Sequence, residues 1–519
     1  MTNASATLDF DLAIVGSGFS GSLLAMIVLR LGRSVILLER GQHPRFAIGE
    51  SSTPLANLLL EELARRYDLP EVLPLTKWGT WQAKHPEIAC GLKRGFTFYH
   101  HAQGKHWKPL SDRRNELMVA ASPHDRIADT HWYRPDFDHF LVRQAQALGA
   151  EYLDQVAISE VAFDHDSVAL HADHAGRPLN VRARFLIDAS GPRGFLHRAL
   201  RLREIPFPRL PATQTLYSHF TDVARWEALH PSPETPPYPP DDAALHHVFD
   251  GGWVWVLRFN NGITSAGVVA TPKIVEQFRL SDGAPAWPRF LASFPSLAEQ
   301  FRDAKPVVPF VYSPRLHFRS ECVAGERWAL LPSAAGIVDP LLSTGFPLTL
   351  LGITRLARIL ENDWNSAQLT ERLRAYEQQT LKELLIAESM VAALYACMDN
   401  SPKFTAVSLL YFAAASFSET ARRLNRAELA GESFLAVEHP EFGPRLRGCL
   451  EVVWGNKGNS LPALAEQIRA AVRTIDVAGL SDPSRRNWYP ARAEDALAAA
   501  PKLGVSEDEI LALLRRAGW

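Results

Sequence analysis

The first forty residues alternate apolar runs with one glycine-rich turn. An apolar run over residues 11–15 is typical of a buried strand, the turn GSGFSG follows it, and a long apolar stretch leads to a second strand that ends at Glu39. Glycines at such a turn let a phosphate approach the N-terminus of the following helix, and a carboxylate about 20 residues further on can accept a hydrogen bond from a ribose hydroxyl. The pattern predicts a βαβ unit that holds a dinucleotide through Gly16, Gly18, Gly21 and Glu39.

Two later segments have the pattern of strands that return to this first sheet. RARFLIDASG (182–191) is an apolar strand followed by a small-residue turn. RWALLPSAAG (327–336) is another, and a helix opens after it near Pro347. The chain is therefore expected to leave the first sheet and come back to it.

A strong hairpin pattern occupies residues 251–269. Two apolar strands are joined through Asn260-Asn261-Gly262, which is a typical hairpin turn. Trp253 and Trp255 are two residues apart and so project from the same face. They pack a core or line a cavity, and core packing is favoured when this segment is taken alone.

The segment CGLKRGFTF (90–98) reads as a short strand that carries a lysine. Strand alternation puts Leu92, Phe96 and Phe98 on one face. It puts Lys93 on the other face, with the small neighbours Gly95 and Thr97. Lys93 is either a surface lysine or a group that reaches into a reaction chamber.

Two further loops precede helices. RFAIGESSTP (45–54) places Gly49-Glu50-Ser51 before a helix, where capping residues are also common. DPLLSTGFPL (339–348) places Ser343-Thr344-Gly345 before a helix with proline in its first turn. The backbone N–H groups of such a turn either start a helix or bind an anion.

The remaining pattern divides into a strand-rich and a helical part. Residues 205–330 alternate short apolar runs with Pro and Gly, which predicts a mixed sheet. From about residue 350 onward, apolar residues recur every three to four positions, which predicts helices. The last helix is expected to begin at a capping box formed by Ser506 and Glu509.

Composition excludes several classes of function. The 519 residues are 47% hydrophobic and 22% charged, with a formal net charge of -2, so a nucleic-acid partner is not expected. No apolar run is long enough to span a membrane, and neither a membrane nor a secretory leader is expected. The four cysteines are scattered and the pair His246-His247 lacks a third ligand, so we expect no metal site and a reducing cytoplasm.

Together with WYRPDFDHFLVRQAQALGAEY, the dinucleotide segments resemble the flavoprotein monooxygenase superfamily over about residues 8–360. Within that superfamily, the chain resembles the flavin-dependent halogenases, which carry GxGxxG, a GE-containing strap, WxWxIP and an active-site lysine. The segments that carry this resemblance are GES, the paired tryptophans, the STG turn and LKRGFTF. Three departures are visible. Pro332-Ser333 replaces the usual Gly-Asp, Leu257-Arg258 follows the tryptophans without the proline, and Leu342 stands where halogenases of free tryptophan have a glutamate.

The resemblance implies an α/β fold with an FAD-binding Rossmann-like domain of the monooxygenase type, a mixed-sheet substrate region and a C-terminal helical region. The expected boundaries are 8–204 and 321–360 for the FAD-binding parts, 205–320 for the substrate sheet and 361–519 for the helices. Further cofactor contacts are expected from Arg40, Asp188, Gly191 and Asp339.

The resemblance also implies a reaction. A separate NADH-dependent flavin reductase would supply FAD as FADH2, and O2 and chloride or bromide would give hypohalous acid. Ser343, Thr344 and Gly345 would hold the halide, Trp253 and Trp255 would line the passage, and Lys93 would present the halogen to the ring. Lys77 in TKWGTW is the alternative lysine, and Glu50 is expected to assist. Leu342 argues against an indole and for the phenol-type branch, most similar to phloroglucinol halogenases; carrier-tethered pyrrole halogenases are the next relatives.

Two other functions remain open from the sequence. An FAD-dependent aromatic hydroxylase that takes hydride directly from NAD(P)H would share the dinucleotide segments. A flavin-binding protein without turnover would share them too. The exact substrate, its attachment to a carrier, the halide preference and the oligomeric state are not specified by the sequence.

Overall fold

The first sheet is built around the parallel strand β1 (Thr7–Val15). The structure is a computed structural model that describes residues 7–455 and 460–519. β1 pairs in parallel with β10 (Arg177–Asp188) on one side and with β2 (Val35–Leu38) on the other, so Leu12, Ala13 and Ile14 have no exposed surface. The sheet order is β18-β19-β10-β1-β2-β7, with β9 and β8 attached to β10. The other strands are β7 (Glu151–Leu153), β8 (Val156–Phe163), β9 (Val168–His174), β18 (Ala324–Gly325) and β19 (Trp328–Leu330).

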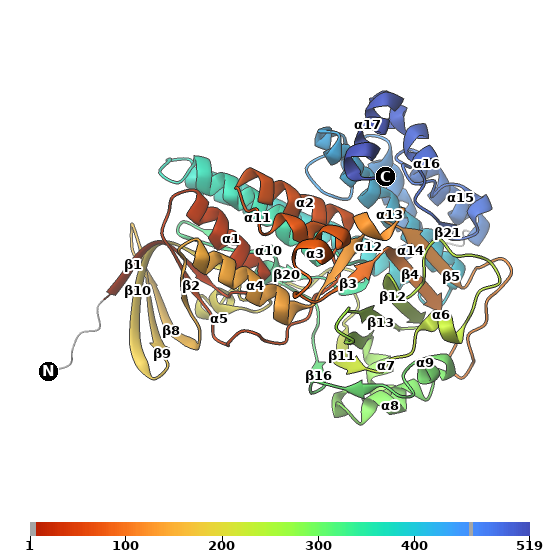
Figure 1. Cartoon of the computed structure of the whole chain (residues 1–519), viewed down its shortest axis with the longest axis horizontal. Helices are drawn as coiled ribbons and strands as arrows, with labels where there is room; N and C mark the ends of the chain where they lie inside the picture. The colour runs from red at the N-terminus through yellow and green to blue at the C-terminus, as the bar shows by residue number, and fades with distance from the viewer. Residues whose placement is uncertain (1–6, 456–459) are drawn as a thin grey trace.

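Long helices connect this sheet to the rest of the molecule. α1 (Phe19–Arg30) packs against α4 (Arg134–Ala147) and α11 (Gly345–Asn362), and α11 packs against α2 (Pro54–Arg66) and α12 (Leu369–Tyr395). Figure 1 shows the first sheet at the left, the second sheet at the lower right and the C-terminal helices above it. The return of β19 beside β10 confirms that the chain comes back to the first sheet.

The second sheet has the order β15-β11-β14-β13-β12-β4-β5-β21, and β16 also pairs with β11. Its strands are β4 (Gly95–His100), β5 (Glu116–Ala120), β11 (Gln214–Thr221), β12 (Ala244–Phe249), β13 (Gly252–Arg258), β14 (Thr264–Ala270), β15 (Lys305–Pro306), β16 (Val311–Ser313) and β21 (Trp488–Tyr489). The sequence boundaries differ from this sheet, because β4, β5 and β21 lie outside 205–320. Pairing between distant segments, such as β12 with β4, leaves no signal in local apolar spacing.

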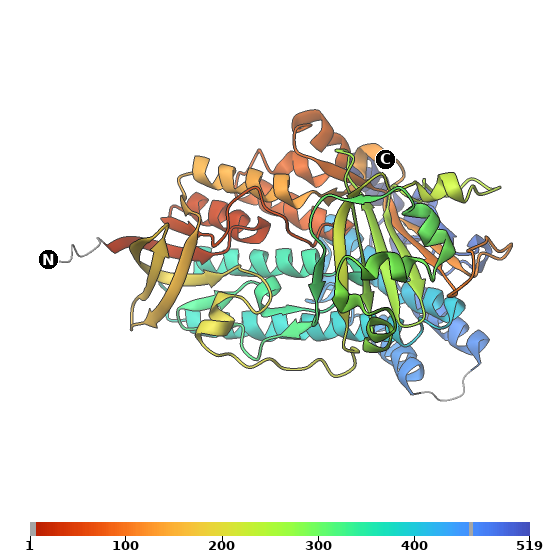
Figure 2. The same ribbon diagram turned by 90° about the horizontal axis from the view of Figure 1, so that it is seen from below.

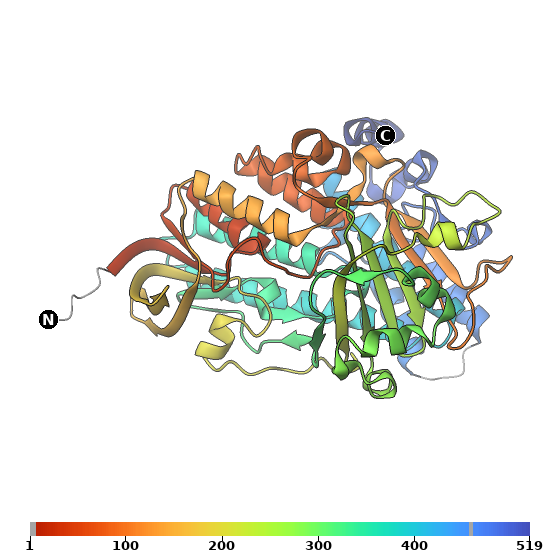
Figure 3. The ribbon, with the colours of Figure 1, turned by 60° about the horizontal axis from the view of Figure 1, so that its bottom comes forward.

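Helices cover both faces of the second sheet. One face packs against short helices and forms its own apolar cluster, and Figures 2 and 3 show these helices beside the strands. The opposite face meets the C-terminal helices, where Phe96 and Phe98 contact Phe412 and Phe404. The short helices are α6 (Trp226–Leu229), α7 (Pro272–Phe278), α8 (Ala286–Leu291) and α9 (Pro295–Gln300). The helices of the C-terminal region after α12 are α13 (Ser401–Arg423), α14 (Phe442–Trp454), α15 (Leu461–Val472), α16 (Ala493–Ala498) and α17 (Glu507–Ala517).

Two local predictions are confirmed, the capping box and the hairpin turn. The capping box of Ser506 and Glu509 starts α17, and the Asn-Asn-Gly turn joins β13 to β14.

The remaining short elements are α3 (Trp78–Lys84), α5 (Phe195–Ala199), α10 (Pro332–Ala335), β17 (Phe318–Arg319) and β20 (Gly336–Ile337). Among the described residues, no helix combines the length and apolarity needed to cross a bilayer, and no three metal-ligating side chains cluster.

The segment 90–98 is not one continuous strand. β3 (Cys90–Lys93) pairs with β6 (Asp129–Trp132), whereas β4 belongs to the second sheet. The chain changes sheets at Arg94, whose N–H donates to the carbonyl of Asp242 and whose carbonyl accepts from Ala121. The predicted alternation is therefore wrong across Arg94, and Lys93 lies against Phe96 instead of sharing a face with Gly95 and Thr97.

The hairpin turn holds β3 in place. Asn260 donates its backbone N–H to the carbonyl of Cys90, and its side-chain oxygen accepts from the N–H of Cys90. At Gly91, an added Cβ would overlap the carbonyl oxygen of Arg258 at the end of β13. Glycine is therefore required for the strand that carries Lys93 to lie this close to β13.

We predict that Gly91→Ala lowers the free energy of unfolding by about 1–3 kcal/mol, the usual cost of overpacking, and displaces β3. Gly448→Ala is the matched control, because its Cβ would meet nothing nearer than 3.5 Å and alanine is favoured over glycine inside a helix. Thermal unfolding of both variants would measure the effect. An unchanged melting temperature for Gly91→Ala would contradict this packing.

Candidate functional site

The glycine-rich turn packs the start of α1 tightly against the end of β10. Gly16 has φ +100°, and a Cβ there would lie 2.7 Å from the carbonyl group of Ala189. A Cβ on Gly21 would overlap the carbonyl oxygen of Gly16. Gly18 precedes α1 and supplies no side-chain cap, so the first turn keeps its N–H groups for a ligand.

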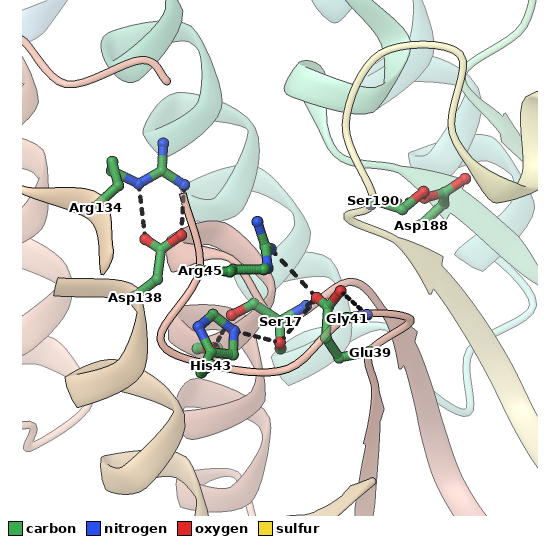
Figure 4. A network of polar contacts seen from close by, with 10 residues as sticks. Ser17, Glu39, Gly41, His43, Arg45, Arg134, Asp138, Asp188 and Ser190 are labelled. Atoms are coloured by element: carbon green, nitrogen blue, oxygen red, sulfur yellow. Dashed lines mark hydrogen bonds and ion pairs between the residues drawn. The ribbon is translucent and has the colours of Figure 1, made fainter. Parts of the chain in front are cut away.

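Glu39 lies at the centre of a polar network at this turn (Figure 4). Its Oε2 accepts from the backbone N–H and the hydroxyl of Ser17, each at 3.0 Å, and its Oε1 accepts from the N–H of Gly41 at 2.8 Å. Arg45 forms an ion pair with it at 3.3 Å. Burial alone would raise the pKa of the Glu39 carboxyl, but Arg45 and the two N–H groups hold it below its usual value. Glu39 is thus an ionised acceptor suited to a ribose diol.

Two guanidinium groups converge on Gly18. A Cβ at Gly18 would lie 3.5 Å from Nη2 of Arg134, 3.6 Å from Oδ2 of Asp138 and 3.8 Å from Nη2 of Arg45. Arg134 is held by two hydrogen bonds to Asp138, both 2.7 Å, and it donates to the carbonyls of Ile48 and Gly49. Cations beside a free helix N-terminus form an anion site, which fits the pyrophosphate of FAD.

Sequence analysis missed both arginines. Arg45 lies beyond the usual acid position, and the only signal for Arg134 was an aspartate four residues later on the same helix, which permits a salt bridge. The predicted Arg40 is exposed and has no recorded polar partner among the described residues. Arg45 forms the ion pair with Glu39, and a cofactor contact from Arg40 stays a prediction.

The other predicted cofactor residues lie apart from Glu39. The carboxylate of Asp188 accepts from the N–H and hydroxyl of Ser190 (Figure 4). It also accepts from the N–H of Leu196 in the first turn of the short helix α5. Gly191 follows with φ +85° and open space at its Cβ position. Asp188 therefore shapes this turn, with both carboxylate oxygens bonded to the protein.

Lys93 is completely buried at the end of β3. Its Nζ donates a hydrogen bond to the carbonyl oxygen of Ser52 and lies 3.9 Å from the centre of the Phe96 ring. On the facing strand β6, Asp129 is its direct Cα partner. Burial lowers the pKa of the Lys93 ammonium, and Asp129 opposes part of this shift. Lys93 is therefore not a surface lysine, and its reach into a reaction chamber stays a prediction.

A cavity of about 200 Å³ lies beside this lysine, between the second sheet and the C-terminal helices. It includes the groups that touch or face Lys93, namely Phe96 and Asp129, and Thr53 next to Ser52. Lys93 itself is not among the residues that line it, whereas Lys77 lines it and donates to the carbonyl of Ala517 at 3.4 Å. Its aromatic lining residues are Phe96, Tyr411, Phe412, Phe434 and Trp519. Such a lining suits a small aromatic ligand.

The strap residue Glu50 points elsewhere. Its carboxylate accepts from His219 of β11 at 2.7 Å, and both side chains are buried. Glu50 is not among the residues that line the cavity. The strap still contributes to the lysine site, because Ser52, two residues later, holds Nζ of Lys93.

Trp253 is linked through Tyr395 to the buried carboxyl group of Asp339, which opens the segment that contains the STG turn. Trp253 donates to the hydroxyl of Tyr395 at 3.1 Å, and Tyr395 donates to Asp339 at 2.9 Å. Burial raises the pKa of Asp339 to about 7. The rings of Trp253 and Trp255 are 5.9 Å apart, and neither lines the cavity beside Lys93.

The turn itself is strained and open. Ser343 has φ +53°, Thr344 precedes α11 without a side-chain cap, and a Cβ at Gly345 would meet no atom within 4 Å. Backbone N–H groups at a helix start with free space before them can bind an anion. The arrangement fits the predicted halide turn at Ser343, Thr344 and Gly345.

Comparisons with known proteins identify the family. The profile of the tryptophan halogenase family matches residues 128–403. The monodechloroaminopyrrolnitrin halogenase PrnC of Pseudomonas fluorescens is 32% identical over 72% of this chain, and the tetracycline 7-halogenase of Kitasatospora aureofaciens is 30% identical over 66%. The matched region spans 66% and 61% of the length of these two relatives.

A solved structure extends the similarity to nearly the whole chain. The halogenase PltM, crystallised with phloroglucinol and FAD, superimposes with a TM-score of 0.82 at 26% identity, covering 92% of this chain and 99% of PltM. The predicted fold class is confirmed, as is the predicted resemblance. The chain belongs to the tryptophan halogenase family of flavin-dependent halogenases.

Proposed function

We propose that the protein is an FADH2-dependent halogenase that installs chlorine or bromine on an electron-rich phenolic ring. The observation that carries this proposal is the fully buried Lys93 beside an aromatic cavity, in a chain of the halogenase family. A solvated lysine has a pKa of about 10.4 and is a poor nucleophile at neutral pH, whereas burial favours the free amine. The cavity and the lysine are thus suited to bring a halogen donor and a ring together.

FAD fits the nucleotide end of the chain. The start of α1, Arg45 and Arg134 would hold its pyrophosphate, and Glu39 would accept from its ribose. When bound and reduced, FAD supplies with O2 the oxidising equivalent that converts halide into hypohalous acid. The STG turn would hold the halide through its backbone N–H groups. A separate NADH-dependent flavin reductase is proposed as the source of reduced flavin.

Lys93 would receive the hypohalous acid. Ser52 fixes Nζ through its carbonyl, and Phe96 covers it on the cavity side. The ammonium can hold the acid by a hydrogen bond, and the free amine can exchange one N–H for an N–halogen bond with release of water. Either form presents an electrophilic halogen to the cavity and keeps it away from the solvent.

A phenolic substrate is supported by two observations. Leu342, which precedes the STG turn, is completely buried and offers no carboxylate to an indole N–H. The aromatic walls of the cavity match a small flat ring, and the similar halogenase PltM was crystallised with phloroglucinol. We therefore propose phloroglucinol or a resorcinol-like ring as the substrate class.

We predict that Lys93→Ala lowers halogenated product by at least about a hundredfold, because the group that presents the halogen is lost. The assay combines enzyme, FAD, flavin reductase, NADH, O2, halide and phloroglucinol, and mass spectrometry reads the halogen isotope pattern. Lys77→Ala is expected to retain the halogenated product. Loss of product in Lys77→Ala but not in Lys93→Ala would reverse the assignment, and an oxygenated product from the wild-type enzyme would indicate a hydroxylase.

We predict that Arg45→Ala weakens FAD binding on the order of tenfold, because one charge-assisted contact to the pyrophosphate is removed. Arg40→Ala is the matched control, since Arg40 is exposed next to Glu39. Quenching of FAD fluorescence on titration with each variant measures the dissociation constants. A weaker complex for Arg40→Ala than for Arg45→Ala would contradict the role given to Arg45 and support a contact from Arg40.

A further inference from the structure

Asp129 faces Lys93 across the β3–β6 pair, and among the described residues no ion pair joins the two side chains. Its Oδ1 accepts a hydrogen bond from the side-chain amide of Asn57 at 2.7 Å. Its Oδ2 is buried and has no hydrogen-bond partner among the described residues. A buried carboxylate oxygen without a donor is costly, so a ligand that brings a donor would be stabilised there.

The cavity contains two acidic residues, Asp129 and Glu419. Glu419 is already bonded to the guanidinium of Arg423 on the same helix. The hydroxyl of Tyr411, another polar group of the wall, donates to the carbonyl of Leu342 at 2.7 Å. Asp129 is thus the acid of this wall with a buried carboxylate oxygen to which none of the described residues donates.

The charges around Asp129 keep its proton affinity close to that of Lys93. Burial raises the pKa of the Asp129 carboxyl, whereas Lys93 and the amide of Asn57 lower it. From α13, Glu419 raises this pKa and Arg423 lowers it. Burial shifts the pKa of Lys93 in the opposite direction, downward. Because these opposite shifts bring the pKa values of Asp129 and Lys93 close together, either group can give or take a proton near neutral pH.

We propose that Asp129 is a catalytic base that accepts the hydrogen bond of a substrate hydroxyl through Oδ2 and takes its proton as the ring carbon attacks the halogen. This inference rests on the proposed halogenase function and assigns the group that activates the phenol. It also explains why the ring would sit beside Lys93, since the two side chains share one strand pair. Glu50 is not suited to this role, because its carboxylate is bonded to His219.

The step balances for hypohalous acid held on the Lys93 ammonium. The phenol O–H proton passes to Asp129, the ring carbon forms a bond to the halogen, and the O–halogen bond breaks. The leaving hydroxide takes a proton from Lys93 and departs as water. The free amine of Lys93 then removes the hydrogen from the halogenated carbon as a proton, and Asp129 returns its proton to the oxygen. The products are the halogenated phenol and water, with both side chains restored.

The test compares two substrates in wild type and in Asp129→Asn. Phloroglucinol carries the hydroxyl groups, whereas 1,3,5-trimethoxybenzene has the same activated ring without any O–H. We expect kcat/KM of Asp129→Asn for phloroglucinol to fall by about 10²-fold or more and that for the trimethoxy ring to stay within about threefold. Asp303→Asn, which changes an exposed acid without a polar partner among the described residues, is the matched control and should leave both rates unchanged.

The pH profile separates a base from a structural role. In wild type, kcat/KM for phloroglucinol should rise with pH as Asp129 ionises, and this acid limb should disappear in Asp129→Asn. Asp129→Glu, which keeps a carboxylate, should retain the limb at a lower rate, and it remains informative if Asp129→Asn does not fold. Equal losses for both substrates, or an unchanged acid limb in Asp129→Asn, would overturn this assignment while leaving the halogenase intact. Absence of halogenated product in wild type would overturn both.

Discussion

The burial of one amine is the constraint on which the site depends. Lys93 has no exposed surface, and its Nζ is held by the carbonyl of Ser52 above the ring of Phe96. Removing a cation from water is costly, so the surroundings either pair the ammonium or favour the neutral amine. The strap, the facing strand β6 and the aromatic wall all contribute to this environment. They come from segments that are distant in sequence, which explains why the site needs the whole fold.

Helices and the strap connect the nucleotide turn to the lysine site. Gly16 and Gly21 let α1 start directly against β10, so the anion site of Arg45 and Arg134 is fixed to the first sheet. α11 begins at the STG turn and packs against α1, so the expected halide site is attached to the same body. The strap, residues 45–54, connects the anion site to the lysine. Arg134 donates to its carbonyls at Ile48 and Gly49, and Lys93 donates to its carbonyl at Ser52.

Local patterns predicted the parts of the site that depend on a single turn or strand. The glycine turn with Glu39, the hairpin and the STG turn follow from residue type and spacing, and the lysine was identified by resemblance. The change of sheets at Arg94 was not predictable, because the backbone N–H of Arg94 donates to the carbonyl of Asp242 in a distant loop. Arg45, Asp129 and the His219 partner of Glu50 were missed for the same reason: each acts through a neighbour that only the tertiary structure brings close.

The pKa of Lys93 is the quantity that tests this account most directly. It can be measured on the folded wild-type protein by NMR titration of lysine Nζ labelled with 15N, with Lys93→Arg used to assign the signal. The account predicts a pKa well below the ordinary value of about 10.4, because burial outweighs the attraction of Asp129. An ordinary pKa would mean that the amine is solvated or that Asp129 fully offsets its burial, and it would contradict an account in which burial outweighs that attraction.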